Sequence, residues 1–338
     1  MTHRNRNGFT IVELLVGLLI IALLITIVVP VAATSRCSAD RLQSAANLRR
    51  LHIALVSYAT DWNRSQWDSI PGDYNEYASC QDYIDQVGCI SPLKIGEDCD
   101  GGMWAYWIPC PDTGGFGSCS NAEVSLPISI QQSLFGSFRF PNNKAIHDYV
   151  GGRFYDPTFY APGDQAYEEA SDKFGIDCGF VPEDNSIAFS SYCLSPAAML
   201  NPNAMTPGGF DQPDVYQSPS VDQAKYPSQK TWLMEHNWIE SPEPCNPAFS
   251  GCVPFFYNAS TQSTPYTLFF DGHVRVLTPM ESMISDKRVR AGGGEGLWSR
   301  DTPFGDSGYY GDVTFEFFTE TSYHVFTFEG ILGRDTLK

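Results

Sequence analysis

Two histidines and one aspartate in the C-terminal third of the chain are candidates for metal or acid–base chemistry. His236 is separated by 34 residues from the segment Asp271-Gly272-His273. Imidazole and carboxylate groups bind transition metals and transfer protons near neutral pH, provided that the fold brings them together. The simpler interpretation is that Asp271-Gly272 forms a turn and that the histidines are surface or capping groups. The turn is the default expectation.

Acidic residues beside glycines are candidates for calcium binding. Calcium prefers several carboxylate and carbonyl oxygens on loops, but neither acidic segment matches the twelve-residue EF-hand pattern. Solvated acidic loops are the default, and calcium is the alternative cofactor. The candidate residues are Asp98 and Asp100 in one segment, and Asp301, Asp306 and Asp312 in the other.

No residue has the sequence context of a catalytic nucleophile. Ser195 and Ser299 lie outside any G-x-S-x-G segment, and no cysteine lies in a recognisable protease signature. The sequence therefore predicts that the protein is not an enzyme.

The ten cysteines predict disulfides and an oxidising compartment. No C-x-x-C pair or zinc-finger spacing occurs, so structural zinc and thioredoxin-like chemistry are disfavoured. Spacing suggests local loops closed by Cys245 with Cys252 and by Cys178 with Cys193. The other six allow about fifteen pairings. They are Cys37, Cys80, Cys89, Cys99, Cys110 and Cys119.

Composition restricts the class of partner. The 338 residues carry 21 Lys and Arg against 39 Asp and Glu, a formal charge of −18. Phosphate contacts need clustered cations, so a nucleic-acid partner is excluded. Charged residues are 18% and aromatic residues 14%, which predicts a folded chain with a substantial core.

The first acidic residue of the chain, Glu13, lies in an apolar segment near the N-terminus. Phe9 to Val29 is long enough to span a bilayer, and Glu13 is its one acidic residue. Arg4 and Arg6 precede it, so the positive-inside rule places its start in the cytoplasm and exports the rest. A carboxylate inside hydrocarbon costs on the order of 2.5–3.5 kcal/mol, which indicates a functional partner for Glu13.

The alternative interpretation is a cleaved secretory signal peptide. Val31-Ala32-Ala33 before Thr34 resembles a small-residue cleavage site after an apolar segment. Glu13 argues against this interpretation, because a signal peptide has no use for a buried acid.

The helix is expected to continue beyond the apolar segment. A stripe with three- and four-residue spacing predicts an amphipathic helix, while Arg41, Arg49 and Arg50 fall mostly on other faces. Pro30 would kink the helix or loosen one turn without ending it. A rod from Phe9 to Trp62 would be roughly 80 Å long, so part of it must project. The stripe comprises Leu42, Ala45, Leu48, Leu51, Leu55, Tyr58 and Trp62.

The remaining sequence predicts short strands joined by turns. Residues 267–270 and 273–277 flank Asp271-Gly272, which supplies the positive φ of a tight hairpin. Residues 314–318 and 323–328 are further strand candidates. A long helix followed by strands predicts an α+β fold, with the helix on an antiparallel sheet bearing long disulfide-containing loops. The expected regions are a leader (1–8), a membrane helix (9–30), an amphipathic extension (31–62) and an exported body (63–338).

The N-terminal residues resemble the type IV pilin signature of pilins and type II secretion pseudopilins. A basic leader ends in Gly8, Phe9 follows, Glu13 is the fifth residue after Gly8 and Pro30 the twenty-second. The resemblance implies that prepilin peptidase cuts between Gly8 and Phe9 and methylates the new amino group. It also implies storage in the inner membrane, assembly of the helices into a filament, and in pseudopilins a calcium site in the C-terminal domain.

A weaker resemblance lies in the body. Phe270-Asp271-Gly272-His273-Val274 after His236 is similar to the C-terminal signature of a planctomycete-type prepilin-like family, which has a histidine, nine residues and Asp-Gly. The 34 intervening residues here depart from that spacing. An insertion carrying Cys245 and Cys252 would explain the excess.

Together these residues predict a structural subunit of a pilus or secretion filament. Its expected partners are prepilin peptidase, identical or related subunits, and the inner membrane, with the body periplasmic or extracellular. The alternative is a membrane-tethered protein that captures a carbohydrate, for which aromatic residues near Trp104 would be candidates. Sequence does not distinguish a pilus from a secretion apparatus or a major from a minor subunit.

Overall fold

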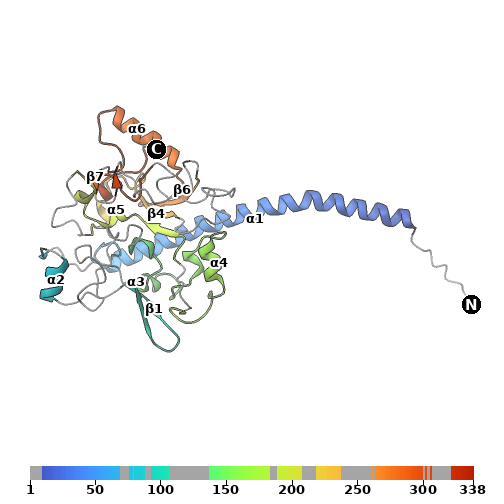
Figure 1. Ribbon diagram of the computed structural model, residues 1–338, viewed down its shortest axis with the longest axis horizontal. Coiled ribbons are helices and arrows are strands. Elements are labelled where there is room, and N and C mark those ends of the chain that lie inside the picture. The colour runs from blue at the N-terminus through green and yellow to red at the C-terminus, as the bar shows by residue number, and fades with distance from the viewer. Residues whose placement is uncertain are drawn as a thin grey trace, which may run out of the picture.

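The computed structural model confirms the α+β class. A single long helix projects from a body of short helices and antiparallel strands (Figure 1). The structure describes residues 10–68, 76–78, 80–87, 93–106, 137–182, 189–207, 218–236, 261, 263–299, 301–302, 305–306 and 321–338.

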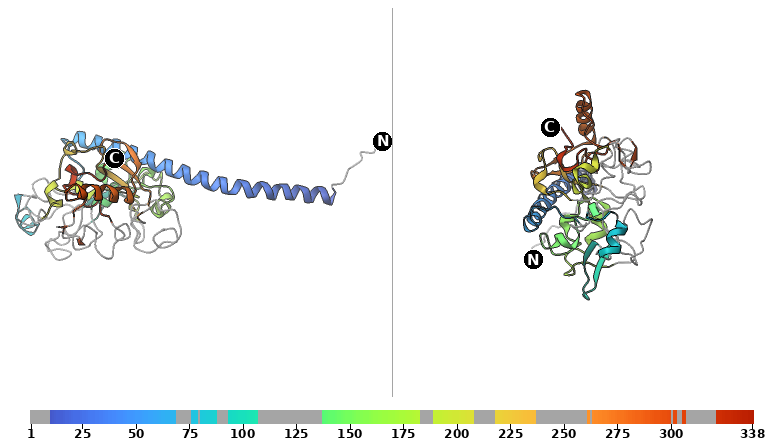
Figure 2. Two further views of the ribbon diagram at one scale, coloured as in Figure 1. Left: turned by 90° about the horizontal axis from the view of Figure 1, so that it is seen from above. Right: turned by 90° about the vertical axis from the view of Figure 1, so that its left-hand side faces the viewer.

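Helix α1 (Ile11–Asp61) has 51 residues, which correspond to about 77 Å of rise. It passes through Pro30 without ending, as expected, and ends at the C-cap Trp62. A proline inside a helix removes one hydrogen bond, and the strongly helical flanks compensate for that loss. Figure 2 shows the helix as a gently curved rod whose N-terminal half stands clear of the body.

The C-terminal half of α1 packs on the body through the predicted stripe. Leu48, Leu51 and Leu55 are at most 3% exposed. The ends of the stripe were predicted wrongly, because Leu42 is 66% and Trp62 59% exposed. Trp62 instead stacks on Tyr58 at the surface.

The helix lies against a four-stranded antiparallel sheet in the order β3-β4-β5-β6. Contacts from α1 reach β5 and β6. The strands are β3 (Tyr192–Leu194), β4 (Thr231–Glu235), β5 (Tyr266–Phe269) and β6 (Val274–Val276).

The predicted hairpin is present between β5 and β6. Gly272 has a φ of +88°, and a Cβ there would lie 2.5 Å from the His52 ring of α1. Glycine is therefore required both by the turn and by the close approach of the helix.

A second hairpin extends from the opposite side of the body. Strands β1 (Leu93–Glu97) and β2 (Met103–Tyr106) pair, and a disulfide joins Cys99 in their loop to Cys178. The predicted pairing of Cys178 with Cys193 is thus wrong; Cys193 is buried with its Sγ 3.5 Å from His324 Nε2. Cys245 and Cys252 lie outside the described residues.

One predicted strand is replaced by turns. The segment 323–328 is buried except for the half-buried Phe328, but it forms turns with a single bridge between Thr327 and Trp298. The His324 backbone is in the left-handed region, at φ +69°, and its N–H donates to Asp335 Oδ1. Residues 314–318 lie outside the described residues.

The remaining elements are short. The helices are α2 (Cys80–Val87), α3 (Lys144–His147), α4 (Gln165–Ser171), α5 (Pro196–Met199) and α6 (Pro279–Ala291). Single turns of 3₁₀ helix are η3 (Ser137–Arg139), η4 (Pro157–Phe159), η5 (Pro202–Met205), η7 (Val221–Gln223) and η9 (Gly330–Leu332). The two-residue strands β7 (Asp301–Thr302) and β8 (Gly305–Asp306) also pair.

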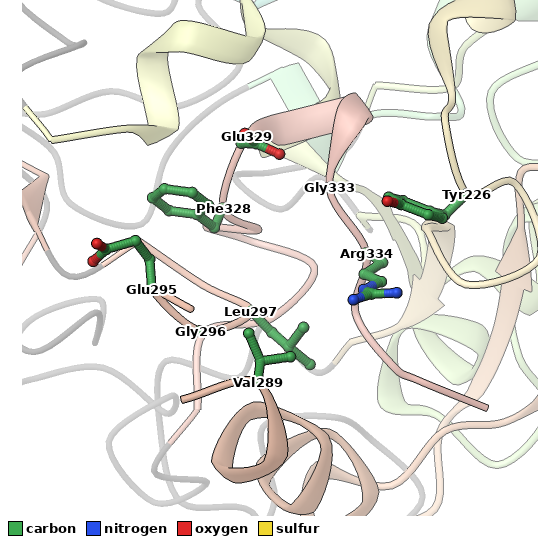
Figure 3. A pocket seen from close by; sticks show the side chains of 9 residues that line it. All are labelled: Tyr226, Val289, Glu295, Gly296, Leu297, Phe328, Glu329, Gly333 and Arg334. Atoms are coloured by element: carbon green, nitrogen blue, oxygen red, sulfur yellow. The ribbon is translucent and has the colours of Figure 1, made fainter. Parts of the chain in front are cut away.

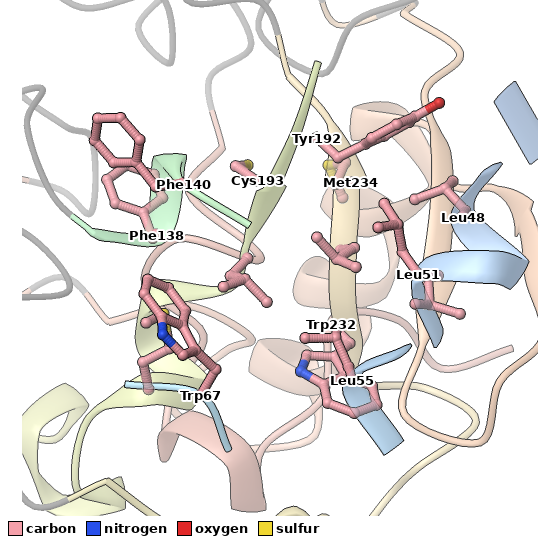
Figure 4. Packing of buried hydrophobic residues seen from close by; sticks show 14 of the residues in the cluster. Leu48, Leu51, Leu55, Trp67, Phe138, Phe140, Tyr192, Cys193, Trp232 and Met234 are labelled. Atoms are coloured by element: carbon pink, nitrogen blue, oxygen red, sulfur yellow. The ribbon is translucent and has the colours of Figure 1, made fainter. Parts of the chain in front are cut away.

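The core lies on both sides of the central strands. Figure 4 shows the buried leucines of α1 on the side of Trp232 and Tyr192, and Phe138 and Phe140 beyond the strands. Burial of such side chains contributes roughly 1.5–3 kcal/mol each, which holds this half of α1 to the body. The N-terminal half receives no such support.

Candidate functional site

The start of α1 is built by a capping box between Thr10 and Glu13. Glu13 Oε2 accepts from the Thr10 backbone N–H at 2.9 Å and from Thr10 Oγ1 at 2.8 Å, and Glu13 N donates to Thr10 Oγ1 at 3.2 Å. This pattern is typical of Thr-x-x-Glu at a helix start. It draws the carboxylate back toward the N-terminal end of the helix. Gly8 and Phe9 themselves lie outside the described residues.

The segment Ile11–Val29 is long and apolar enough to cross a membrane, and none of it is buried. Its large apolar side chains are 49% (Val16) to 78% (Ile11) exposed. An uncovered apolar surface of this size is typical of a segment that contacts lipid or other chains. The backbone of α1 stays helical at Pro30.

A partly buried ion pair joins α1 to the sheet. Arg41 donates to Glu235 at 2.6 Å and also to the Thr264 carbonyl. Ser44 completes the cluster, with its hydroxyl 2.9 Å from that of Tyr192 and a short hydrogen bond to Glu235. Burial raises the pKa of Glu235 even beside this guanidinium.

Sequence reasoning placed Arg41 away from the packed face and missed this contact. The signal that could have found it is Glu235, an acid at the end of an otherwise apolar strand. Arg41 lies twelve residues beyond Val29, which separates the ion pair from the apolar segment by about 18 Å of helix.

The structure does not bring the three candidate metal or acid–base residues together. Asp271 Oδ1 lies 2.5 Å from His273 Nδ1, whose ring stacks on Phe269. His236 follows the other end of β4, because Thr231 pairs with Phe269 in the antiparallel register. Five residues of strand, about 17 Å, therefore separate it from Asp271. Within the described part of the chain, no group of three or more His, Cys, Asp or Glu could hold a metal ion.

The candidate calcium residues differ in their roles. Asp98 Oδ1 accepts from the backbone of Asp100 and Gly102, while Oδ2 accepts from Trp104 Nε1. These bonds, that from Trp104 first, lower the pKa of Asp98. The carboxylate thus closes the β1–β2 loop. Asp301 and Asp306 are paired in the backbone register of β7 and β8, and Asp312 lies outside the described residues.

A fully buried polar cluster was not predicted from sequence. Lys230 Nζ donates to Asp335 Oδ2 at 3.0 Å, to Thr327 Oγ1 at 2.7 Å and to Ser195 Oγ at 2.9 Å. Asp335 also accepts from Thr231 N at 2.9 Å. Lys230, Asp335 and Ser195 have no exposed surface. The arrangement therefore fixes the C-terminal segment in the core and offers a substrate no access to Ser195.

One pocket of about 190 Å³ lies between the end of α6 and the C-terminal segment (Figure 3). Arg334 lies over the Tyr226 ring at 4.9 Å on one side. Glu295 and Glu329 lie on the other side, and both are exposed. Its lining residues are Tyr226, Val289, Glu295, Gly296, Leu297, Phe328, Glu329, Gly333 and Arg334.

Comparison with known proteins identifies the N-terminal segment. The family described as the prokaryotic N-terminal methylation motif matches residues 3–29. The search of curated proteins gave no match, and neither did the search of solved structures. No finding supports the second, planctomycete-type resemblance, which stays a prediction. The motif supports a pilin-like or pseudopilin-like substrate of prepilin peptidase. The chain thus carries a type IV pilin-like signature on an exposed apolar helix.

Proposed function

We propose that this chain is a filament subunit, assembled through α1 into a type IV pilus or type II secretion filament. Prepilin peptidase would cut between Gly8 and Phe9 and methylate the new amino group. The chain would be the substrate of these reactions and perform no catalysis of its own. The observation that carries this proposal is Glu13, a lone acid at the start of an apolar segment that the body leaves uncovered.

Within the described residues, one carboxylate oxygen of Glu13 has no hydrogen-bond partner. Both hydrogen bonds from Thr10 end on Oε2. Oε1 is left to accept from the Phe9 ammonium of a neighbouring subunit after cleavage. Each charge is costly in hydrocarbon, and pairing them would offset both penalties. The pairing would also set the axial register of the subunits.

The location follows from the same helix. The leader would face the cytoplasm and the apolar segment would cross the inner membrane. The body would lie in the periplasm, or outside the cell after assembly. An oxidising compartment agrees with the disulfide between Cys99 and Cys178.

Glu13 has a structural role as well as the proposed one, and substitutions can separate them. Glu13→Gln keeps a side chain that completes the capping box but removes the charge. Thr10→Val removes the hydroxyl of the cap and keeps the charge. Glu13→Ala removes both. We expect filament yield after shearing to fall about tenfold or more for Glu13→Gln and Glu13→Ala, an effect of at least about 1.4 kcal/mol. Thr10→Val should stay within about threefold of wild type, because a lost cap costs about 1 kcal/mol or less.

The control is the amount of processed protein in the membrane, which should be equal for all variants. Wild-type filament yield from Glu13→Gln would show that the acid serves only the cap, and would reject the charge-pair mechanism.

The alternative function gives a different result in the same experiment. A membrane-tethered carbohydrate-binding protein would be retained in the membrane, and shearing wild-type cells would release no filaments containing it.

A further inference from the structure

The apolar surface that remains exposed on the body is concentrated in two places. Outside α1 and its C-cap Trp62, the described residues include six exposed large apolar side chains. Two lie on α6, three lie on or beside the β1–β2 hairpin, and one lies on α2. They are Met280 and Ile284, then Met103, Trp104 and Ile176, and Val87.

The patch on α6 is basic. Lys287 and Arg288 share the outer face of the helix with Met280 and Ile284, because these positions are spaced by three, four or eight residues. The two acids of α6 are already used, since Glu281 pairs with Arg275 and Asp286 with Arg290. Among the described residues no acid pairs with Lys287 or Arg288. We call Met280, Ile284, Lys287 and Arg288 the basic pole.

The inner face of α6 holds the helix in place. Ser282 Oγ donates to the Asp335 carbonyl at 2.6 Å, and Ser285 Oγ accepts from Leu337 N at 3.2 Å. The basic pole is therefore fixed relative to the body.

Acids outnumber cations in the patch at the hairpin, where Lys94 is exposed and Arg153 donates to the Ile176 carbonyl at 2.8 Å. The disulfide between Cys99 and Cys178 brings Asp100 and Asp177 to the same end of the body. Glu168 and Asp172 follow on and after α4, and all four acids are exposed. We call the set Asp100, Glu168, Asp172, Asp177, Met103, Trp104 and Ile176 the acidic pole.

The two poles lie at opposite ends of the body. Figures 1 and 2 both place α6 at one end and the β1–β2 hairpin at the other, across the axis of α1. The basic pole thus faces away from the acidic pole, and each pole combines apolar side chains with its charged ones. Two different, complementary patches on one chain can make head-to-tail contacts, which propagate as an open helical assembly where the rotation between copies does not close a ring.

We propose that the basic pole of one copy docks on the acidic pole of the next copy. The inference rests on the proposed function, and it adds the contact between exported bodies to the contact between helices. A charge of −18 makes copies repel one another, so neighbouring bodies need a contact that uses the scarce cations.

Charge reversal in the full-length chain tests the contact. Lys287→Glu with Arg288→Glu makes both poles acidic, and Asp100→Lys, Glu168→Lys, Asp172→Lys and Asp177→Lys together make both poles basic. Each of these two variants alone should lose about tenfold or more in sheared filament yield. Co-expressing the two should restore the yield, because each can then alternate with the other.

Lys94→Glu is the matched control for Arg288→Glu. Lys94 is an exposed residue of β1 at the acidic pole, and both substitutions change the net charge by the same amount. We expect Arg288→Glu to lower the yield and Lys94→Glu to leave it unchanged or raise it. Equal losses from both would mean a general charge effect and would overturn the proposal.

The remaining outcomes also decide the question. Wild-type yield from Lys287→Glu with Arg288→Glu, or failure of the co-expressed pair, would overturn the contact between poles. A loss confined to the α6 variant would assign the basic pole to another acidic partner, such as an anionic membrane. Equal melting temperatures would show that the variants fold. Wild-type filaments in the same experiment keep the proposed function separate, since their absence would reject that function first.

Discussion

At the scale of residues, titratable groups in this protein are placed for different purposes. Glu13 is exposed on an apolar helix, where Thr10 is the one described residue that donates to its carboxylate, through Oε2. Lys230 and Asp335 are fully buried and neutralise one another inside the core. The exposed position of Glu13 suits a contact with another chain, whereas the buried pair of Lys230 and Asp335 suits a permanent role in the core.

Two buried histidines predict that the body loses stability in mild acid. Burial lowers the pKa of His147 to about 4 and that of His324 to about 3. In the unfolded chain both would titrate near the ordinary value of 6.5. Below that pH the unfolded state binds protons that the folded state does not, so folding stability falls as the pH falls.

The pH range from 7 to 5 lies above the ordinary pKa values of Asp and Glu, and comparing a histidine variant with wild type isolates the contribution of that histidine. Each histidine should contribute about 2 kcal/mol of destabilisation at pH 5 relative to pH 7. His147→Gln keeps a donor for the Asn142 carbonyl, which lies 2.9 Å from His147 Nε2. We expect the free energy of unfolding of this variant, measured in detergent, to fall by about 2 kcal/mol less than that of wild type between pH 7 and pH 5. A slope equal to that of wild type would contradict the assignment.

At the scale of elements, α1 has two functions along one continuous helix. Its first half is exposed and its second half is packed on the sheet, with the ion pair from Arg41 to Glu235 close to the transition. The body is therefore held rigidly by a helix whose other end is free to contact lipid or neighbouring subunits.

Leu51 and Ile53 provide a matched test of this division. Leu51 is 1% exposed and Ile53 65% exposed on the same helix. Leu51→Ala should destabilise the body by about 2–5 kcal/mol, because it leaves a cavity against the sheet. Ile53→Ala should change stability by about 0.5 kcal/mol or less. Thermal unfolding of both variants measures the difference, and similar losses from the two would show that α1 packs differently.

Local sequence signals predicted the elements that depend on neighbouring residues. The length of α1 follows from apolar spacing, and the β5–β6 turn follows from Asp271-Gly272. Contacts between distant segments could not be predicted in the same way. The segment 323–328 alternates like a strand, yet His324 N binds Asp335 and its carbonyl accepts from Ser195. Tertiary hydrogen bonds thus replace the ladder that the pattern suggested.

The candidate site shows the same limit. Thr10 and Glu13 form their capping box within one helical turn, so the sequence alone suffices to predict it. Arg41 and Glu235 are 194 residues apart, and only the fold shows that they meet. The disulfide between Cys99 and Cys178 joins residues that are 79 positions apart in the sequence, whereas spacing alone suggested Cys193 as the partner of Cys178.

At the scale of the whole molecule, this disulfide should be a major contributor to stability. Closing a loop of 79 residues restricts the unfolded chain and is worth about 4 kcal/mol on the chain-entropy account. The paired substitution Cys99→Ser with Cys178→Ser should lower the melting temperature and loosen the acidic pole. Calorimetry of the variant against wild type tests this expectation. An unchanged melting temperature would mean that the hairpin loop is held by other contacts.

The central claim is that an apolar helix becomes an assembly surface once the leader is removed. Mass spectrometry of the mature amino terminus, on protein purified from cells that process it, tests this claim most directly. We predict a chain that begins at Phe9 with a methylated amino group. A chain that begins at Thr34, or one that retains Met1, would contradict the account.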